Sequence, residues 1–285
     1  MTTALTIRPM TRPELDTLGD WAADEAWNPG LSDAQIFWDT DPDGFIAAER
    51  NGALIGGGSI VAYAGRFGFM GFFIVHPEHR GQGLGRQLWH ARRARLIARL
   101  QAPAVIGMDG VFAMQGFYAR GGFVFSHRDL RFEGVGMAST PDARLVDLTE
   151  VPFAELVRYD AAHFPAPRET FLRAWIAQPG SCALGVVQES RLQGYGVIRS
   201  CRQGFKIGPL FAADAEIAEA LFSGLSRHAR GVPILLDVPE NNPEALALAA
   251  RHGLREVFGC ARMYYGPPPH LPDHELFGVT TFELG

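Results

Sequence analysis

A glycine-rich turn, residues 76–86, carries the clearest chemical signal in the sequence. It follows an apolar run that ends at Val75 and precedes a stretch able to form a helix, residues 84–100. Three glycines in the turn let the backbone bend sharply and approach a ligand closely. The unpaired N–H groups of a first helical turn, together with the helix dipole, attract an anion. The pattern therefore predicts a cradle for phosphate groups.

Two well-known phosphate loops do not fit this turn. A P-loop ends in Gly-Lys-Ser or Gly-Lys-Thr, and no lysine follows these glycines. The dinucleotide fingerprint needs a third glycine where Arg86 stands, and an acidic residue about twenty positions further on. A nucleotide-hydrolysing loop and a dinucleotide fold are therefore both disfavoured.

The spacing Arg80-x-x-Gly83-x-Gly85 resembles the acetyl-CoA loop of the GNAT family of N-acetyltransferases. Val75-x-Pro77 lies upstream of it, and Phe117-Tyr118-x-x-x-Gly122-Phe123 lies downstream at the distance typical of that family. The resemblance covers roughly residues 5–133. It implies an acyltransferase that uses acetyl-CoA as cosubstrate and needs no metal.

The resemblance also implies which residues hold the cosubstrate. In GNAT proteins the strand before the loop splays from its neighbour, and its free backbone groups pair with the pantetheine arm. The loop binds the pyrophosphate, and a residue one helical turn before the tyrosine of the family's motif contacts CoA. The asparagine usual near position 111 is Val111 here. The implied cosubstrate-binding residues are Phe73, Ile74, Val75, Arg80, Gly81, Gln82, Gly83, Leu84, Gly85, Arg86 and Gln115.

Acetyl transfer to an amine needs a proton donor for the departing thiolate and a group that deprotonates the amine. Tyr118 matches the family's tyrosine, and a phenol with a pKa near 10 is protonated at pH 7. We therefore expect Tyr118 to be the general acid. The general base stays open, because several candidates have equally good structural explanations and water can relay the proton. These candidates are Glu49, Asp109, His127 and Asp129.

The first half contains the elements that must position these residues. Thr11 and Glu14 form a capping box before a helix, and Ser32 is expected to cap a second one. Strands are expected over residues 45–49, 54–64, 67–75 and 104–108, with a hairpin turn at 50–53, a short helix over 113–120 and a closing strand or hairpin over 123–132. Glycines 56–58 predict a bulge. Arg92 falls within the apolar face of the helix that follows the loop.

The second half repeats this order after a small, polar linker at residues 134–142. We expect an α/β fold (α+β with mixed sheets). It would consist of two tandem GNAT-like domains, each a mostly antiparallel sheet flanked by helices. The N-terminal domain, residues 1–135, would bind acetyl-CoA and catalyse the transfer. The C-terminal domain, residues 143–285, would be degenerate. Its last stretch is expected to pack back on the body through Leu276, Phe277, Val279 and Phe282.

The second half lacks the residues for acetyl-CoA chemistry. No glycine cradle follows its corresponding strand, and Asp214 and Glu216 stand at the start of the next helix. These carboxylates suit a self-capped helix and would repel a pyrophosphate. Ala249 stands where the tyrosine would be. We therefore expect only the first half to bind acetyl-CoA, while the second half shapes the acceptor pocket.

The acceptor region is expected between the first two helices. Residues 13–49 hold ten acidic residues and no lysine or arginine, which would attract a protonated amine. Trp27 and Asn28 are candidates to contact the acceptor. In the second half, Asp160 and His163 flank the equivalent loop and could complete the pocket.

Composition bounds the remaining possibilities. The 285 residues carry a net charge of −5 and include one lysine, Lys206, so nucleic acid is an unfavourable partner. The N-terminus has no signal-peptide core, and no apolar run reaches membrane-spanning length, so no membrane partner is expected. Three separated cysteines disfavour a disulfide framework, and a cytoplasmic location follows as the default. A monomer or a homodimer is equally compatible with the sequence.

The sequence therefore predicts transfer of an acetyl group from acetyl-CoA to the amine of a small-molecule or amino-acid-like acceptor. A protein or peptide N-acetyltransferase is the alternative within the fold, and it would need an open groove. A non-catalytic acyl-CoA-binding sensor is the alternative of a different class. Such a sensor would bind CoA through the loop without transferring the acyl group.

Overall fold

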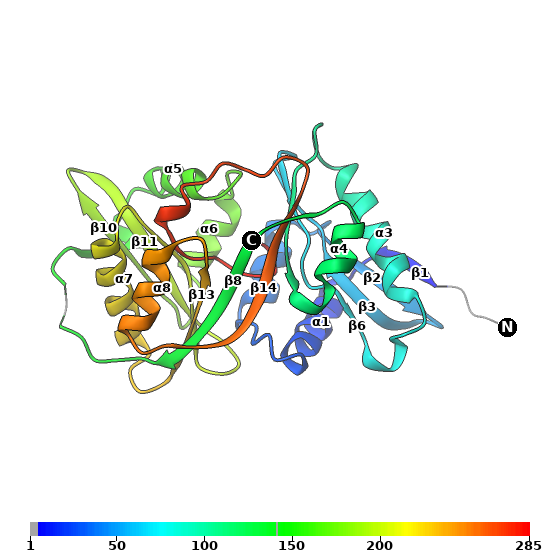
Figure 1. Cartoon of the computed structure of the whole chain (residues 1–285), viewed down its shortest axis with the longest axis horizontal. Helices are drawn as coiled ribbons and strands as arrows, with labels where there is room; N and C mark the ends of the chain where they lie inside the picture. Colours follow the sequence, from blue (N-terminus) through cyan, green and yellow to red (C-terminus); the bar gives the residue numbers. More distant parts are fainter. Residues whose placement is uncertain (1–4, 141) are drawn as a thin grey trace.

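The computed structural model describes residues 5–140 and 142–285. Its two halves lie side by side along the long axis, and two long strands cross between them (Figure 1). The first half contains, in chain order, β1 (Thr6–Pro9), α1 (Arg12–Asp24), α2 (Asp33–Thr40), β2 (Phe45–Arg50), β3 (Ala53–Ser59), β4 (Val61–Tyr63), β5 (Phe67–Phe69), β6 (Ile74–Val75), α3 (Leu84–Ile97), β7 (Ile106–Val111), α4 (Gln115–Arg120) and β8 (Val124–Val135). The second half contains β9 (Leu145–Asp147), α5 (Phe153–His163), α6 (Glu169–Ile176), β10 (Cys182–Gln188), β11 (Arg191–Ser200), β12 (Phe205–Ala212), α7 (Ala215–His228), β13 (Pro233–Pro239), α8 (Pro243–Arg251), β14 (Arg255–Tyr265) and β15 (Leu276–Gly278). The mixed α/β class is as expected.

The first two helices begin in different ways. α1 starts with the predicted capping box, in which the Thr11 backbone N–H donates to the Glu14 carboxylate at 2.8 Å. The expectation that Ser32 caps α2 is wrong, because its side chain makes no capping hydrogen bond. The Asp33 carboxylate instead accepts from the Gly30 N–H at 2.8 Å and closes the turn that leads into the helix.

The β2–β3 hairpin turns where the sequence predicts. Asn51 and Gly52 have φ values of 55° and 76°, the left-handed conformation that a tight hairpin turn requires. The ladder shifts register opposite Ala48 and Glu49, which places a bulge beside the glycine run. Gly58 has a further reason to be glycine, since a Cβ there would lie 2.3 Å from the Arg92 guanidinium carbon.

The strand expected over residues 67–75 is two strands that leave in different directions. β5 pairs in parallel with β7, at Gly68 opposite Ile106, whereas β6 pairs with β3. Arg92 holds the point of divergence: its guanidinium donates to the Ser59 and Gly71 carbonyls at 2.5 and 2.6 Å. These hydrogen bonds explain why an arginine lies in the apolar face of α3. Burial lowers the pKa of Arg92 to about 9. The divergence opens a gap between β6 and β7.

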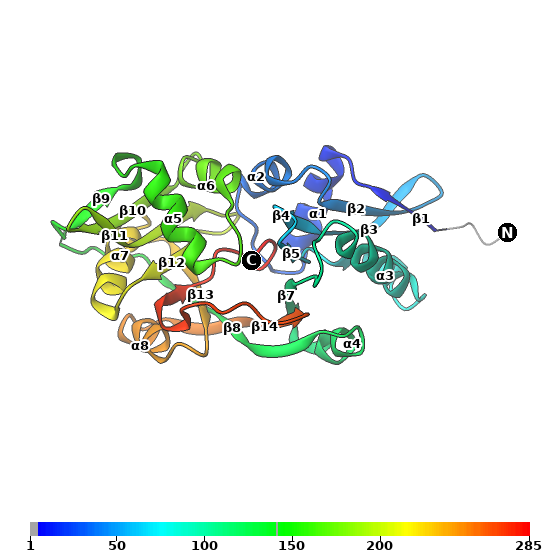
Figure 2. The ribbon, with the colours of Figure 1, turned by 90° about the horizontal axis from the view of Figure 1, so that it is seen from above.

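The two halves exchange strands. The segment expected to close the first half is one long strand, β8, and not a hairpin. It lies between β13 and β14, while β14 lies between β7 and β8. Figure 2 shows β8 and β14 running together from α8 in the second half to α4 in the first. One sheet therefore continues through both halves in the order β4-β5-β7-β14-β8-β13-β12-β11-β10-β9, with β15 beside β12.

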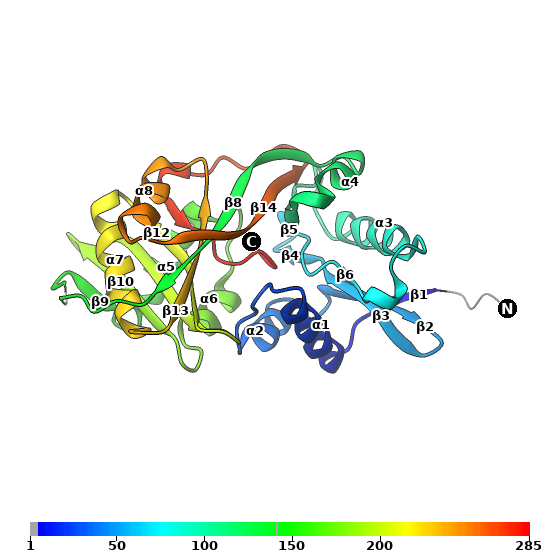
Figure 3. The same ribbon diagram turned by 60° about the horizontal axis from the view of Figure 1, so that its bottom comes forward.

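The second half has a divergence of its own, and the chain fills it. β12 pairs with β13 only over Phe205–Ile207, and beyond that point residues 276–285, here called the 276–285 segment, lie against it. A Cβ on Gly208 would lie 2.5 Å from the Thr280 carbonyl oxygen. The predicted packing is confirmed, since Phe277, Val279 and Phe282 are buried. Figure 3 shows this segment passing from the second half toward β4 and β5 of the first.

Candidate active site

A cavity of about 430 Å³ occupies the gap between β6 and β7. Its walls come from the splayed strand before the glycine-rich turn, from the turn itself, from β7 and α4, and from two segments of the second half. The lining residues are Glu25, Trp27, Met70, Gly71, Phe72, Phe73, Ile74, Val75, His79, Arg80, Gly81, Gly85, Arg86, Met108, Asp109, Val111, Met114, Phe117, Tyr118, Phe258, Cys260, Phe282 and Glu283. The cavity therefore joins the residues singled out for CoA binding to groups from the far end of the chain.

The glycine-rich turn has the conformation that an anion cradle needs. Gly81 and Gly83 both have φ values of 76°, and Gly83 is the residue before the first turn of α3. A left-handed conformation at both positions is costly for any residue with a Cβ. Arg80 is anchored, since its Nε donates to the Val75 carbonyl at 2.8 Å and its guanidinium pairs with Glu25.

The structure places most of the implied CoA residues at the cavity and some away from it. Phe73, Ile74, Val75, Arg80, Gly81, Gly85 and Arg86 line it. Gln82 instead accepts a hydrogen bond from Arg50 at 2.9 Å, and Leu84 is buried in the core. Gln115, at the start of α4, does not line the cavity, although its neighbour Met114 does.

Tyr118 lies in the cavity wall. It is 4% exposed, and a Cβ on Gly110 would lie 2.4 Å from its ring, so the glycine in β7 makes room for the tyrosine. Its ring also packs on Trp89, with 5.0 Å between ring centroids. Burial raises the pKa of Tyr118 to about 12. The phenol therefore stays protonated through the neutral range and can donate a proton.

Three of the four base candidates meet in one buried cluster. Arg262 of β14 donates to both Asp109 carboxylate oxygens, at 2.6 and 2.8 Å, and lies 3.3 Å from Asp129 of β8. His127 lies 3.5 Å from Asp129. Burial and the neighbouring Asp129 raise the pKa of Asp109, against the lowering effect of Arg262. Glu49 lies elsewhere, bound to Arg8.

The candidate acceptor residues separate in the structure. Trp27 lines the cavity, but Asn28 does not: its side-chain amide is bonded to the Gln203 backbone at 2.8 and 2.9 Å. Asn28 therefore fixes the α1–α2 loop of the first half to the β11–β12 turn of the second half.

The expectation that Asp160 and His163 complete the pocket is corrected. Asp160 is fully buried in the second half, where both of its oxygens accept from Arg168 at 2.8 and 2.9 Å. His163 bonds to the Tyr159 carbonyl and to Glu275, each at 2.8 Å. Neither residue lines the cavity, because their polar atoms tie helix α5 to the segments that cover it.

Sequence reasoning assigned Phe282 to packing alone and did not single out Glu283. Both belong to the 276–285 segment and line the cavity from the second half. The Glu283 carbonyl accepts from the Ser59 hydroxyl at 3.1 Å, and the same hydroxyl accepts from the Gly71 N–H at 2.8 Å. No local pattern marks Glu283, since its position depends on how the whole second half folds.

Two further observations concern the described residues. No group of three or more histidine, cysteine, aspartate or glutamate side chains in residues 5–140 and 142–285 is arranged to hold a metal ion. Within the same residues, the helices are all too short or too polar to span a bilayer.

Family models match both halves of the chain. The model described as Acetyltransferase (GNAT) family matches residues 12–123, and one described as Acetyltransferase (GNAT) domain matches residues 156–278. The chain thus belongs to the GNAT acetyltransferase family and has two GNAT domains in tandem. It is an acetyltransferase of that family, in agreement with the resemblance carried by the glycine-rich turn.

Relatives and solved structures cover nearly the whole chain. Holothin acyltransferase of Pseudoalteromonas sp. is 26% identical over 98% of this chain and 94% of its own length. The uncharacterized N-acetyltransferase YitH of Bacillus subtilis is 25% identical over 78% of each chain. A Pyrococcus horikoshii crystal structure aligns with a TM-score of 0.84 at 21% identity, covering 99% of this chain and 96% of its own. A tandem GNAT protein from the clavulanic acid biosynthesis pathway aligns with a TM-score of 0.62 at 15% identity, covering 93% and 100%.

Proposed function

We propose that the first half transfers an acetyl group from acetyl-CoA to the amine of a small, largely apolar acceptor. The observation that carries the proposal is the cavity in the β6–β7 gap. It is lined by Gly81 of the anion cradle, by Tyr118 and by aromatic side chains from both halves. GNAT proteins use acetyl-CoA, and the donor groups of this cavity suit it.

The cavity residues match the chemistry of each part of acetyl-CoA. The N–H groups of the turn around Gly81 and Gly83 and the first turn of α3 suit the pyrophosphate. Residues 72–75 have left the β5–β7 ladder, so their backbone groups can pair with the amides of the pantetheine arm. Arg86 also lines the cavity and adds positive charge.

Tyr118 would supply the proton that the departing thiolate needs. A phenol buried in a low-dielectric wall holds its proton until sulfur develops negative charge, and it can then donate that proton. A backbone N–H of the splayed strand would polarise the thioester carbonyl. The chain's residues thus provide binding, orientation and one proton.

The second half supports a small acceptor over a peptide. Phe258 and Phe282 of the second half line the cavity together with Phe72 and Trp27 of the first, which leaves less room for an extended peptide. The relative that spans almost the whole chain is named holothin acyltransferase, a name that makes holothin rather than a protein the molecule acylated. Together these observations favour a small, largely apolar amine.

The chain's arrangement also supports a single acetyl-CoA site. The 276–285 segment fills the second divergence, where β15 pairs with β12 at Leu210 opposite Gly278. The Asp214 carboxylate accepts from the Ile217 N–H at 2.8 Å and so occupies the start of α7 that a phosphate would need. We expect one acetyl-CoA bound per chain by calorimetry, and two would contradict this part of the proposal.

The proposal is tested by following thiol release from acetyl-CoA across a panel of amines, polyamines, amino acids, aminoglycosides and peptides. Tyr118→Phe should lower kcat tenfold or more, about 1.4 kcal/mol of barrier, with an unchanged Kd for acetyl-CoA. Tyr265→Phe is the matched control, since Tyr265 packs on Phe123 outside the cavity lining. Tight acetyl-CoA binding without turnover on any acceptor would favour a sensor, and turnover on peptides alone would favour a protein acetyltransferase.

A further inference from the structure

Three acidic residues among the described residues line the cavity, and their carboxylates differ in their partners. Glu25 is paired with Arg80, and both oxygens of Asp109 accept from Arg262. Glu283 is 3% exposed, and its Oε2 has no hydrogen-bond partner within residues 5–140 and 142–285. A buried carboxylate oxygen without a donor is costly, so it calls for an explanation such as a catalytic role.

The backbone around Glu283 is rigidly placed. Its carbonyl lies where a Cβ of residue 71 would be, 2.1 Å from the ideal position, so only glycine fits at Gly71. The Ser59 hydroxyl bonds to both residues. The next residue is fixed too, since the Tyr63 hydroxyl donates to the Leu284 carbonyl at 2.9 Å. Glu283 therefore lies at the point where β5 and β6 diverge.

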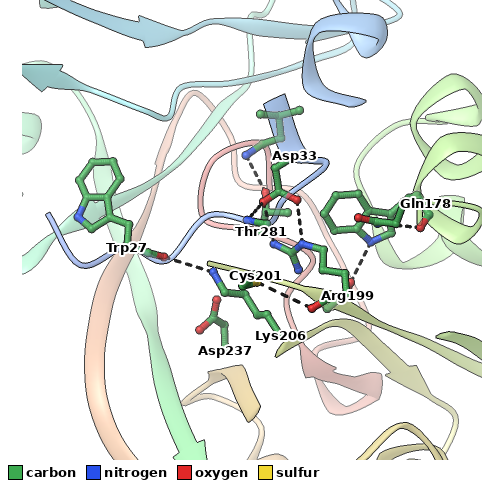
Figure 4. A network of polar contacts seen from close by, with 12 residues as sticks. Trp27, Asp33, Gln178, Arg199, Cys201, Lys206, Asp237 and Thr281 are labelled. Atoms are coloured by element: carbon green, nitrogen blue, oxygen red, sulfur yellow. Dashed lines mark hydrogen bonds and ion pairs between the residues drawn. The ribbon is translucent and has the colours of Figure 1, made fainter. Parts of the chain in front are cut away.

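Buried charged groups from several elements surround Glu283, and Figure 4 shows some of them. Arg199 forms an ion pair with Asp33, and Arg131 forms one with Asp237. The Nη1 of Arg199 has no hydrogen-bond partner among the described residues. Among the residues that the structure describes, no carboxylate lies within hydrogen-bonding distance of Lys206, which donates to the Trp27 carbonyl at 3.4 Å. The groups of this network are Asp33 of α2, Arg131 of β8, Arg199 of β11, Lys206 of β12 and Asp237 of β13, together with Glu283 of the 276–285 segment. Within the described residues, the Glu283 carboxylate and the Lys206 ammonium are in no ion pair, and the charges of the six groups sum to zero when Glu283 is ionised.

Burial and Asp33 raise the pKa of Glu283, whereas Lys206, Arg131 and Arg199 lower it, and the net direction is upward. A carboxylate with a raised pKa is a stronger proton acceptor near neutral pH than an ordinary one. Burial also lowers the pKa of Lys206.

We propose that Glu283, delivered by the second half, is the general base of the first half's acetyl transfer. This inference rests on the proposed function. It assigns a catalytic residue that lies outside the domain that binds acetyl-CoA, and it gives the tandem arrangement a chemical purpose.

In the proposed transfer, Glu283 and Tyr118 act on opposite sides of the reaction, as proton acceptor and proton donor. The Glu283 carboxylate accepts one proton from the acceptor ammonium, and the free amine forms a C–N bond to the thioester carbon. The C–S bond breaks, its electron pair goes to sulfur, and the Tyr118 hydroxyl protonates that sulfur. The second proton leaving nitrogen restores Tyr118 through water, and Glu283 releases its proton to solvent. The products are the amide, CoA thiol and one proton.

The test compares Glu283→Gln with Asp273→Asn, an exposed carboxylate earlier in the same C-terminal stretch. In Glu283→Gln we expect kcat at pH 7 to fall about 10²-fold or more, with the Kd for acetyl-CoA unchanged. Wild type should show an acidic limb whose inflection belongs to the Glu283 carboxyl. In Glu283→Gln that inflection should be missing, and the remaining rate should follow only the deprotonation of the amine. Asp273→Asn should keep both the rate and the pH profile.

A second readout does not depend on turnover. With desulfo-CoA bound, we expect the protonated amine to bind wild type at least tenfold more tightly than Glu283→Gln in calorimetry. If Glu283→Gln does not fold, Glu283→Asp is the second variant: it keeps the carboxylate, and should retain the acidic limb at a lower kcat.

The outcomes separate the two proposals. A wild-type protein that transfers no acetyl group overturns the proposed function. An active wild type whose Glu283→Gln variant keeps its kcat, its acidic limb and its amine affinity overturns the assignment of Glu283. Loss of the acidic limb in Asp109→Asn instead would move the base to the Arg262 cluster.

Discussion

The Ser59 hydroxyl donates to the Glu283 carbonyl at 3.1 Å, across 224 positions of sequence. Ser59 ends β3 in the first half, and Glu283 comes from the segment that fills the divergence of the second half. The same hydroxyl accepts from the Gly71 N–H, so one side chain fastens the 276–285 segment to the splayed strand. The cavity floor is therefore built by both halves.

The left-handed glycine before α3 gives a prediction on acetyl-CoA binding. Gly83→Ala places a Cβ at a φ of 76°, which costs about 1–2 kcal/mol or displaces the first-turn N–H groups. We expect the Kd for acetyl-CoA to rise at least fivefold in calorimetry. Gly52→Ala is the matched control, because Gly52 has the same φ in an exposed hairpin turn away from the cavity. An equal rise in both variants would refute a specific role for the turn.

The buried pair between β8 and β13 gives a prediction on stability. Asp237 accepts from Arg131 at 2.6 and 2.8 Å, and both are buried. Asp237→Asn leaves a buried guanidinium without its counter-charge, so the free energy of unfolding should fall by about 3 kcal/mol or more. Urea unfolding measures this loss.

The control for that prediction is an exposed ion pair between β8 and the turn after β13. Arg128 and Glu240 also pair, but the Arg128 side chain is 52% exposed. Glu240→Gln should cost less than about 1 kcal/mol. Similar losses for Glu240→Gln and Asp237→Asn would contradict the importance of burial.

The strand exchange predicts how fragments behave. A fragment of residues 1–135 lacks β14, which separates β7 from β8 and pairs Met263 with Met108. We expect this fragment to show no cooperative thermal transition and no acetyl-CoA binding, and to regain both when residues 143–285 are co-expressed. A lone fragment that melts cooperatively and binds acetyl-CoA would show that the exchange is dispensable. The boundaries 1–135 and 143–285 stay predictions until that result.

The raised pKa of Glu283 predicts a pH-dependent stability difference. A carboxyl whose pKa is higher in the folded than in the unfolded state stabilises the fold below the unfolded value, about 4.5. That contribution is lost as pH rises through the folded value. The melting temperature of Glu283→Gln relative to wild type should therefore increase between pH 4 and pH 8. A difference that stays constant with pH would mean that the carboxyl does not titrate as proposed.

The glycine-rich turn, Tyr118 and the order of the elements could be predicted from the sequence, because local conformation and hydrophobic periodicity fix them. The left-handed φ values of Gly81 and Gly83 and the capping box at Thr11 depend on neighbours a few residues away. The absence of a second cradle, with Asp214 capping α7, could be read in the same way.

The tertiary structure alone decided what completes the cavity. Asp160 and His163 looked like pocket residues, yet Arg168 and Glu275 hold them inside the second half. Strands β8 and β14 exchange because either half leaves an open position beside its own strands that the other can fill, and no local pattern encodes this. Glu283 reaches the first half only through that arrangement, since a contact across more than two hundred residues depends on the packing of everything between them.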